Sequence, residues 1–253
     1  MNTSTQHPLH LPGTPQEGDL SVAQKLQIES IQGNIKKIVW VIGDAIENLK
    51  ENQRKIEEIA VACEQAEDKR LMPFAKLIQE TGNVNENDSN GQTVLMSASR
   101  NGHTEIVKLL LAHPDIQVNK NNSHGDTALM NAVFYSRVDI TELLLFHPGI
   151  FVNHQNSHGD TALIYAARRD HKVITKLLLA HQEIQVNEKN SNGNTALMSA
   201  SSNGHTVITK LLIADPRLKL EEHDQWKTAL EQAKTPEIKA LIEEAMKKQG
   251  IPF

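Results

Sequence analysis

Histidine is the residue type in this chain that could most readily carry chemistry, because a neutral imidazole ring binds metal ions and transfers protons. The chain has 12 histidines among its 253 residues. Three of them, His113, His147 and His181, are evenly spaced, and a residue that recurs at a fixed spacing is explained first by a repeated structural unit. His154 and His158 could approach each other across a turn, but no carboxylate or thiol pattern accompanies them. We therefore expect no metal site.

Cysteine is the other reactive residue type, and the chain has one, Cys63. It lies in an apolar stretch, where we expect a small buried hydrophobic side chain and not an activated thiolate. One cysteine cannot form an intramolecular disulfide, which favours the cytoplasm or another reducing compartment. The sequence also lacks glycine-rich phosphate loops, nucleophile elbows and zinc-protease motifs. We expect no catalytic residue and no cofactor, so that the protein is not an enzyme.

Composition narrows the class of partner. Hydrophobic residues make up 39% of the chain, which is enough for a folded core. The balance of 26 basic against 31 acidic residues gives a net charge of -5, which argues against general nucleic-acid binding. No apolar run approaches the ~20 residues that span a bilayer. The first residues show no conventional signal peptide, and secretion by a route that reads other signals stays open.

The spacing of the histidines belongs to a longer repeated pattern. Threonine recurs in one context at a nearly constant interval, at Thr93, Thr127, Thr161, Thr195 and Thr228. In the first four units a glycine precedes the threonine by two residues, which suits a tight turn with positive φ, and the threonine suits the N-cap of a short helix. A second, more apolar helix follows and ends at a His-Pro pair. Neither helix could bury its apolar face alone, so stacked units in a solenoid are expected.

These residues resemble the ankyrin repeat. The family pattern of Gly-x-Thr-x-Leu, then Ala, Gly-His and a Leu-Leu-Leu helix is nearly complete at 91–111 and 193–213. The usual proline after threonine is Val94 or an alanine, and the usual histidine two residues later is methionine or isoleucine, so apolar packing should replace its hydrogen bond. The resemblance implies an all-α ankyrin-repeat solenoid over residues 70–247. Its expected parts are a cap at 70–89, repeats at 90–123, 124–157, 158–191 and 192–224, a C-terminal cap at 225–247 and a tail at 248–253.

An N-terminal helical segment is expected at 19–69, after a disordered lead-in at 1–18. Apolar residues follow a heptad pattern, with a positions at Ile28, Ile35, Ile42, Leu49, Ile56 and Cys63 and d positions at Ile31, Ile38, Ala45, Asn52, Ile59 and Ala66. The pattern fits an intermolecular coiled coil, which would make a homodimer, or an intramolecular helical bundle with a turn at 51–55. Around Val39 to Ile46 the apolar surface is too broad for a two-stranded coiled coil. We therefore favour the bundle and a monomer.

The resemblance also implies a function. Ankyrin arrays are protein–protein interaction modules that present first helices and turn tips as a concave binding surface. The alternative is an enzyme or enzyme subunit with its activity in the N-terminal helical segment, for which the array selects the substrate. The HPDIxVN sequence of the repeats is similar to that in the repeats of host-directed bacterial effectors. A host-cell cytosol is therefore an alternative to the cytoplasm as the location.

The partner-binding residues are expected where the repeats differ from one another on the first helix. Aromatic and arginine side chains dominate interface hot spots, and the middle repeats concentrate them. The predicted binding residues are Arg100, Asn131, Phe134, Tyr135, Tyr165, Arg168 and Arg169. Phe134 and Tyr135 could instead fill space between units. We expect a partner with an acidic or aromatic segment, and little loss of stability when Tyr165 and Arg168 are both replaced by alanine.

Asparagines that follow valine repeat with the same period, at Asn85, Asn119, Asn153 and Asn187. We expect them to serve as turn residues whose side-chain amides satisfy loop backbone groups. The family resemblance adds that Asn119, Asn153 and Asn187, each with a leucine eight residues earlier, can be hydroxylated by the asparaginyl hydroxylase of hypoxia signalling.

Overall fold

The computed structural model describes residues 21–66, 68–218, 223–248 and 250, and its regular elements over these ranges are helices. The chain divides into two compact units, Met1–Glu51 and Asn52–Phe253. The helices are α1 (Val22–Gln65), α2 (Met72–Thr81), α3 (Val94–Asn101), α4 (Thr104–Leu111), α5 (Ala128–Phe134), α6 (Val138–Phe146), α7 (Ala162–Arg168), α8 (Lys172–Ala180), α9 (Ala196–Asn203), α10 (Thr206–Ile213), α11 (His223–Glu231) and α12 (Pro236–Lys248). The expectation of an all-α ankyrin solenoid is confirmed.

The turns before α5 and α7 require glycine for two reasons. Gly125 and Gly159 have φ values of 78° and 70°, in the left-handed region that favours glycine. A Cβ atom at Gly125 would lie 2.7 Å from the backbone nitrogen of Ser157, and one at Gly159 would lie 2.6 Å from that of Ser191. Each of these nitrogens lies in the turn that precedes the next first helix, so successive turns approach too closely for any side chain.

The repeated threonines cap the first helices, as the sequence predicts. The Thr93 hydroxyl accepts a hydrogen bond from the Met96 backbone nitrogen at 3.2 Å, at the start of α3. Equivalent bonds of 3.2–3.3 Å begin α5, α7 and α9. An oxygen in this position satisfies one of the free N–H groups that every helix start exposes.

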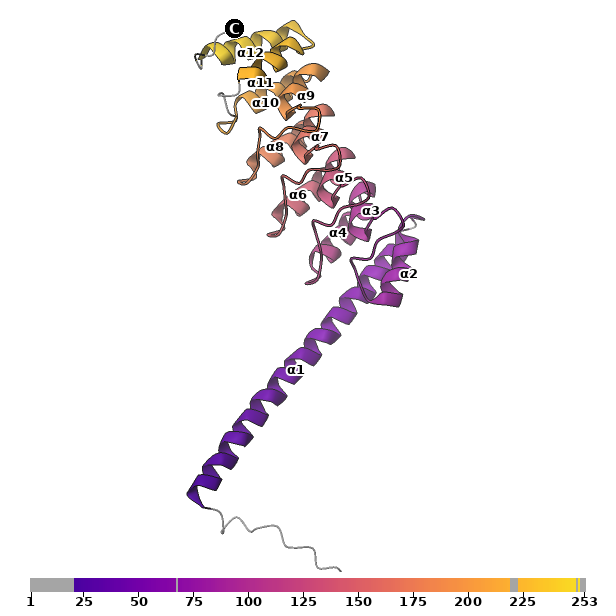
Figure 1. Ribbon diagram of the computed structural model, residues 1–253. Coiled ribbons are helices and arrows are strands. Elements are labelled where there is room, and N and C mark those ends of the chain that lie inside the picture. Colours follow the sequence, from indigo (N-terminus) through magenta and orange to yellow (C-terminus); the bar gives the residue numbers. More distant parts are fainter. Residues whose placement is uncertain (1–20, 67, 219–222, 249, 251–253) are drawn as a thin grey trace, which may run out of the picture. The chain divides into compact units, whose positions relative to one another are not determined.

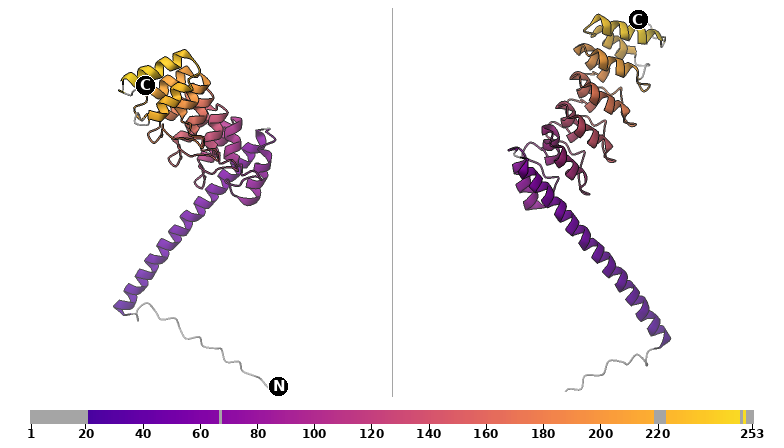
Figure 2. Two further views of the ribbon diagram at one scale, coloured as in Figure 1. Left: turned by 45° about the horizontal axis from the view of Figure 1, so that its top comes forward. Right: turned by 180° about the vertical axis from the view of Figure 1, so that it is seen from behind.

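The helix pairs of the unit Asn52–Phe253 stack in two rows (Figures 1 and 2). The first helices α3, α5, α7, α9 and α11 contact one another in order, as do the second helices α4, α6, α8, α10 and α12. The apolar faces of both rows form one core, in which Leu95, Leu129, Leu163 and Leu197 are buried at equivalent positions. No single pair encloses its own apolar side chains, so burial depends on the neighbours.

Asparagine amides connect the exit loops of successive units. Asn153 donates a hydrogen bond from Nδ2 to the Glu183 carbonyl oxygen at 2.7 Å and accepts one at Oδ1 from the Gln185 backbone nitrogen at 2.8 Å. Asn85 and Asn119 make the same pair of bonds, each to backbone groups 30 and 32 residues later, and Asn187 makes the first of the two to Arg217. The expected role is confirmed, and the bonded groups lie in the next unit. We call these four residues the asparagine ladder.

The N-terminal segment is one helix and not several. α1 continues through residues 51–55, so the turn considered there is wrong, and within Met1–Glu51 the described residues form no helical bundle. Three residues of its last part, Ile59, Ala60 and Cys63, are fully buried in the core of the unit Asn52–Phe253 together with Phe74 and Ile78 of α2. This compact unit therefore starts about 18 residues before the expected boundary at 70, since the end of α1 supplies the first helix of the first pair.

The C-terminal end is closed by α11 and α12. Trp226, which stands in the place of the repeat glycine, is buried at 1% exposure, and Ile238 and Ile242 of α12 are fully buried. α11 begins at His223, five residues before Thr228, so this threonine lies inside the helix and is not its N-cap. The outer side of α12 is polar, as a terminal helix requires for solubility, and exposes Glu237, Lys239, Glu244, Lys247 and Lys248.

The asparagine ladder generates a prediction about stability. Asn153→Ala leaves a carbonyl and an N–H group of the next loop without their partner, and we expect it to lower the free energy of unfolding by about 1–3 kcal/mol. Urea denaturation followed by circular dichroism measures the change. Asn90→Ala, at an exposed turn position, is the matched control and should change stability by less than about 0.5 kcal/mol. Equal effects of the two variants would contradict a role of the ladder in stability.

Candidate protein-binding surface

The residues predicted to bind a partner lie at the C-terminal ends of three successive first helices. Arg100 is in the last turn of α3, Phe134 ends α5 and Tyr135 caps it, and Arg169 caps α7. Since α3, α5 and α7 pack side by side, equivalent positions in adjacent units come together although a whole unit separates them in the sequence. Side chains from equivalent positions of successive repeats therefore form a continuous strip along the array.

Cationic and aromatic side chains stack along this strip. The Arg100 guanidinium lies 4.7 Å from the centroid of the Tyr135 ring, and the Arg169 guanidinium lies 3.5 Å from that of Phe134. The two rings contact edge to face, with centroids 5.0 Å apart. Such cation–π contacts hold a guanidinium flat against a ring while its N–H groups stay available at the surface. We call Arg100, Phe134, Tyr135 and Arg169 the cation–aromatic row.

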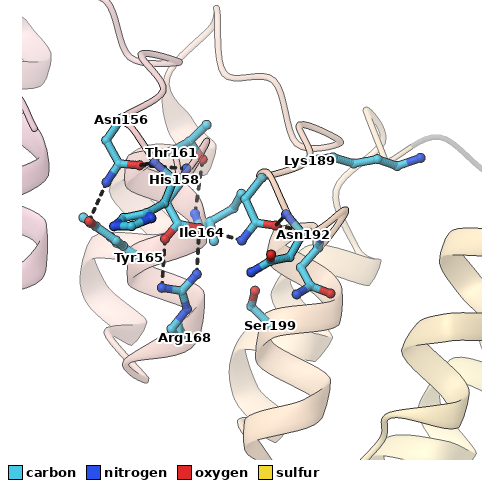
Figure 3. A network of polar contacts seen from close by, with 12 residues as sticks. Asn156, His158, Thr161, Ile164, Tyr165, Arg168, Lys189, Asn192 and Ser199 are labelled. Carbon is cyan, nitrogen blue, oxygen red and sulfur yellow. Dashed lines mark hydrogen bonds and ion pairs between the residues drawn. The ribbon is translucent and has the colours of Figure 1, made fainter. Parts of the chain in front are cut away.

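Tyr165 lies beneath this row and is largely buried, at 8% exposure. Its ring contacts Phe134 edge to face, with centroids 5.4 Å apart. Its hydroxyl group donates a hydrogen bond to Asp126 at 3.2 Å. It also accepts one from Nδ2 of Asn156 at 2.7 Å (Figure 3). Burial, and then the nearby Asp126 carboxylate, raise the pKa of Tyr165 above its usual range. The Tyr165 hydroxyl group therefore makes its hydrogen bonds within the protein.

Arg168 is also engaged within the array. Its two terminal nitrogens donate hydrogen bonds of 2.9 and 2.7 Å to the two carboxylate oxygens of Asp160, which is buried (Figure 3). Nδ2 of Asn190, in the segment before α9, donates a further bond to Asp160 at 2.7 Å. A bidentate ion pair to a buried carboxylate holds the guanidinium in one orientation. Beside it opens a polar pocket of about 440 Å³, lined by His158, Asp160, Arg168, Asn190, Asn192, Asn194, Ser199, Ser202 and Asn203.

Two predicted binding residues are therefore placed differently from the expectation. Asn131 and Tyr165 are each 8% exposed, and Nδ2 of Asn131 donates a hydrogen bond to the Thr127 carbonyl oxygen within its own helix. Tyr165 is instead fixed by Asp126, a residue that the sequence reasoning missed. The exposed members of the predicted set are Arg100, Tyr135 and Arg169, with Phe134 and Arg168 half-buried.

The sequence distinguishes Asp126 and Asp160 from the residues at the same position in the other repeats. Asp126 and Asp160 occupy equivalent positions in successive units, whereas the same position in the flanking units holds Gln92 and Asn194. Carboxylates at this position therefore occur in the same two middle units that carry the aromatic side chains.

The reactive residue types occupy structural positions. Cys63 is a free, fully buried thiol, and burial raises its pKa to about 12, which opposes thiolate formation. Nε2 of His103 lies 2.9 Å from the Asp68 carboxylate, and Nε2 of His205 lies 3.1 Å from the Arg168 carbonyl oxygen. Burial lowers the pKa of His171. Over the described residues, no group of three or more histidine, cysteine or acidic side chains is arranged to hold a metal ion.

The sites of expected hydroxylation lie in the asparagine ladder. Asn119 and Asn153 are half-buried, with both ends of each amide bonded to the next unit. Asn187 is half-buried as well. An enzyme acting on these side chains would need to separate two exit loops locally.

The hydroxylation stays a prediction with a direct measurement. After incubation of the chain with the asparaginyl hydroxylase, we expect intact-mass spectrometry to show the addition of one oxygen atom for each modified residue among Asn119, Asn153 and Asn187. The triple alanine variant at these positions is the control. An unchanged mass of the native chain would end the hypothesis.

The buried position of Tyr165 generates a further prediction. Tyr165→Phe removes the hydroxyl that bonds Asp126 and Asn156, and we expect it to lower the free energy of unfolding by about 1 kcal/mol. Tyr165→Ala also leaves a cavity and should lower it by about 3–5 kcal/mol. This replaces the expectation that stability would be nearly unchanged. Urea denaturation measures both, with Tyr135→Phe, at the 37% exposed tyrosine, as the matched control. A Tyr165→Ala variant as stable as the native chain would contradict the assignment.

Comparison with known proteins agrees with this geometry. A family model described as ankyrin repeats (3 copies) matches residues 59–156 and 149–224, which is more than half of the chain. No match is found among curated proteins. Of the helices described, none is long and apolar enough to cross a membrane. Ankyrin repeats indicate a module for protein–protein interaction in general. With its capped, paired helices and the match over both halves of the array, the chain belongs to the ankyrin-repeat family.

Proposed function

We propose that the protein is a non-catalytic binding module that captures a partner protein on the cation–aromatic row, on the concave side of the array. The observation that carries the proposal is the exposure of Arg100 and Arg169 over aromatic rings at the junctions of three units. Aromatic side chains supply large contact areas with few rotamers to lose, and arginine adds bidentate and stacked contacts, so both types dominate interface hot spots.

The charge of the row supports a partner with an acidic segment. Among the described residues, neither the Arg100 nor the Arg169 guanidinium makes an ion pair, whereas Arg168 is paired with Asp160. Guanidinium groups that are oriented by stacking can form bidentate bonds to carboxylates. An aromatic side chain next to the acidic group would extend the edge-to-face contacts of Phe134 and Tyr135.

The location proposed for this function is the cytoplasm, or a host-cell cytosol for a protein of the effector type. The buried and protonated Cys63 thiol needs no oxidising compartment, which supports either location. An activity in the N-terminal helical segment, the alternative considered from the sequence, has no supporting observation among the described residues of α1.

The repeats themselves suggest a test that spares the fold. The position of Tyr135 and Arg169 is occupied by Asn101 and Asn203 in the flanking units, so Tyr135→Asn with Arg169→Asn introduces residues that the fold already accepts. We expect this double variant to bind the captured partner at least about 100-fold more weakly, since hot-spot side chains contribute about 2 kcal/mol each. Proteins captured from a lysate by the native chain are identified, and their affinity is then measured with purified components.

A matched control removes an aromatic and a basic residue elsewhere on the array. Phe146 and Lys176 are exposed on the second helices α6 and α8, so Phe146→Asn with Lys176→Asn changes the composition equally. We expect this control to keep full affinity and both variants to keep the native unfolding temperature. If the control loses binding and the Tyr135/Arg169 variant does not, the partner binds the opposite row of helices and the proposal is wrong.

A further inference from the structure

One face of α1 is strongly apolar although it is exposed. Between residues 28 and 49 the helix presents a continuous series of large apolar side chains that are 40–68% exposed. They are Ile28, Ile31, Ile35, Ile38, Val39, Val41, Ile42, Ile46 and Leu49. Monomeric proteins rarely expose so long an apolar surface unless it is an interaction site.

Charged residues are excluded from this face over nearly four helical heptads. With Ile28 at position a, every charged residue from 28 to 54 falls at position b, c or f. These charged residues are Glu29, Lys36, Lys37, Asp44, Glu47, Lys50, Glu51 and Arg54. The e and g positions, which flank the a and d positions, hold only uncharged side chains, namely Gln32, Asn34, Val39, Val41, Ile46, Asn48 and Gln53. We call the a, d, e and g positions of residues 28–53 the uncharged face.

The width of the uncharged face indicates how many helices cover it. A two-stranded coiled coil buries mainly a and d and leaves e and g at a rim where charged residues are usual. Here Val39, Val41 and Ile46 make the middle of the rim apolar as well. Isoleucine occupies a and d together at Ile35 and Ile38, a combination that favours three or four strands over two. The face therefore fits a bundle of three or more helices.

The uncharged face ends where the heptad pattern enters the core of the unit Asn52–Phe253. The heptad positions that follow, Ile56, Ile59 and Cys63, are buried in the core of the unit Asn52–Phe253, so the chain's own core takes up the apolar pattern only from residue 56. Residues 1–20 contain three leucines and three prolines, too little apolar surface to cover a face of this length.

A membrane surface is also a poor match. Helices that lie in a lipid headgroup layer carry an excess of lysine and arginine on their polar face. The polar face of residues 28–51 has three lysines and four acidic residues, so anionic lipid would not be attracted.

A second copy of the chain matches the face by its chemistry. Identical uncharged faces bring no like charges together in either a parallel or an antiparallel arrangement, and each copy supplies the apolar surface that the others need. We propose that residues 28–53 of α1 associate with the same segment of other copies, forming a homo-oligomeric helical bundle of three or more chains. This replaces the monomer favoured from the sequence, which depended on an intramolecular bundle. It does not depend on the proposed partner surface.

The test is the mass of the full-length protein in solution. Sedimentation equilibrium at 10–50 µM protein should give at least about three times the 28.2 kDa of one chain. Ile31→Lys with Ile42→Lys places charge at d and a, and we expect a monomer. Ser30→Lys with Gly43→Lys adds the same charge at c and b and should keep the native mass. A side chain fits at Gly43, since no atom lies within 4 Å of its Cβ position.

Every other result overturns the proposal. A native chain that is monomeric leaves the face for a different partner or for lipid, and sedimentation with vesicles containing phosphatidylserine then identifies the lipid case. A native dimer contradicts the bundle of three or more helices. If the Ser30/Gly43 variant is monomeric like the Ile31/Ile42 variant, the contact between chains lies outside the uncharged face. Circular dichroism and the unfolding temperature of each variant show that the array is still folded.

Discussion

Contact between neighbouring units is the constraint on which the array depends. A pair of short helices such as α5 and α6 has about two turns in each helix, too short to be stable alone in water. Leu129 of α5 is buried because α3 and α7 pack on either side of that helix, and Leu144 of α6 is buried because α4 and α8 do the same. The asparagine ladder and the close approach of the glycine turns fix the distance between units, since both bond or contact backbone groups of the next unit. The stability of the array therefore depends on the contacts between neighbouring units.

The same junctions build the functional surface. The Arg169 guanidinium stacks on Phe134 of the preceding unit, and Arg100 stacks on Tyr135 of the following one. Asp126 and Asp160 hold Tyr165 and Arg168 from turns, and Asp160 also accepts a bond from Asn190 in the segment before α9. No unit contains the whole arrangement. Because the spacing of the units is fixed by the backbone, the side chains at these positions can differ between units without altering the fold, and a specific surface can form where they do.

Local features of the fold could be predicted from the sequence, and features that depend on contacts across units could not. The roles of Thr93 as an N-cap and of Gly125 in its turn follow from the residues within three positions, so the pattern was sufficient. Tyr165 was expected at the surface because its helical position faces the concave side. Its burial depends on Asp126, 39 residues earlier, and on Phe134 of the preceding unit. The continuity of α1 through residues 51–55 was also missed, because a polar stretch fits an exposed helix as well as a turn.

The ends of the array show how a repeat changes when it has one neighbour. At the C-terminus, Trp226 replaces a glycine whose turn would otherwise receive a following unit, and its indole ring fills the core. At the other end, Ile59 and Cys63 of α1 provide the apolar side chains that a preceding first helix would have supplied. A helix that closes the array on one face is free to continue beyond it, since its hydrogen bonds are internal. That freedom allows α1 to be 44 residues long, whereas the first helices within the array have seven to nine residues.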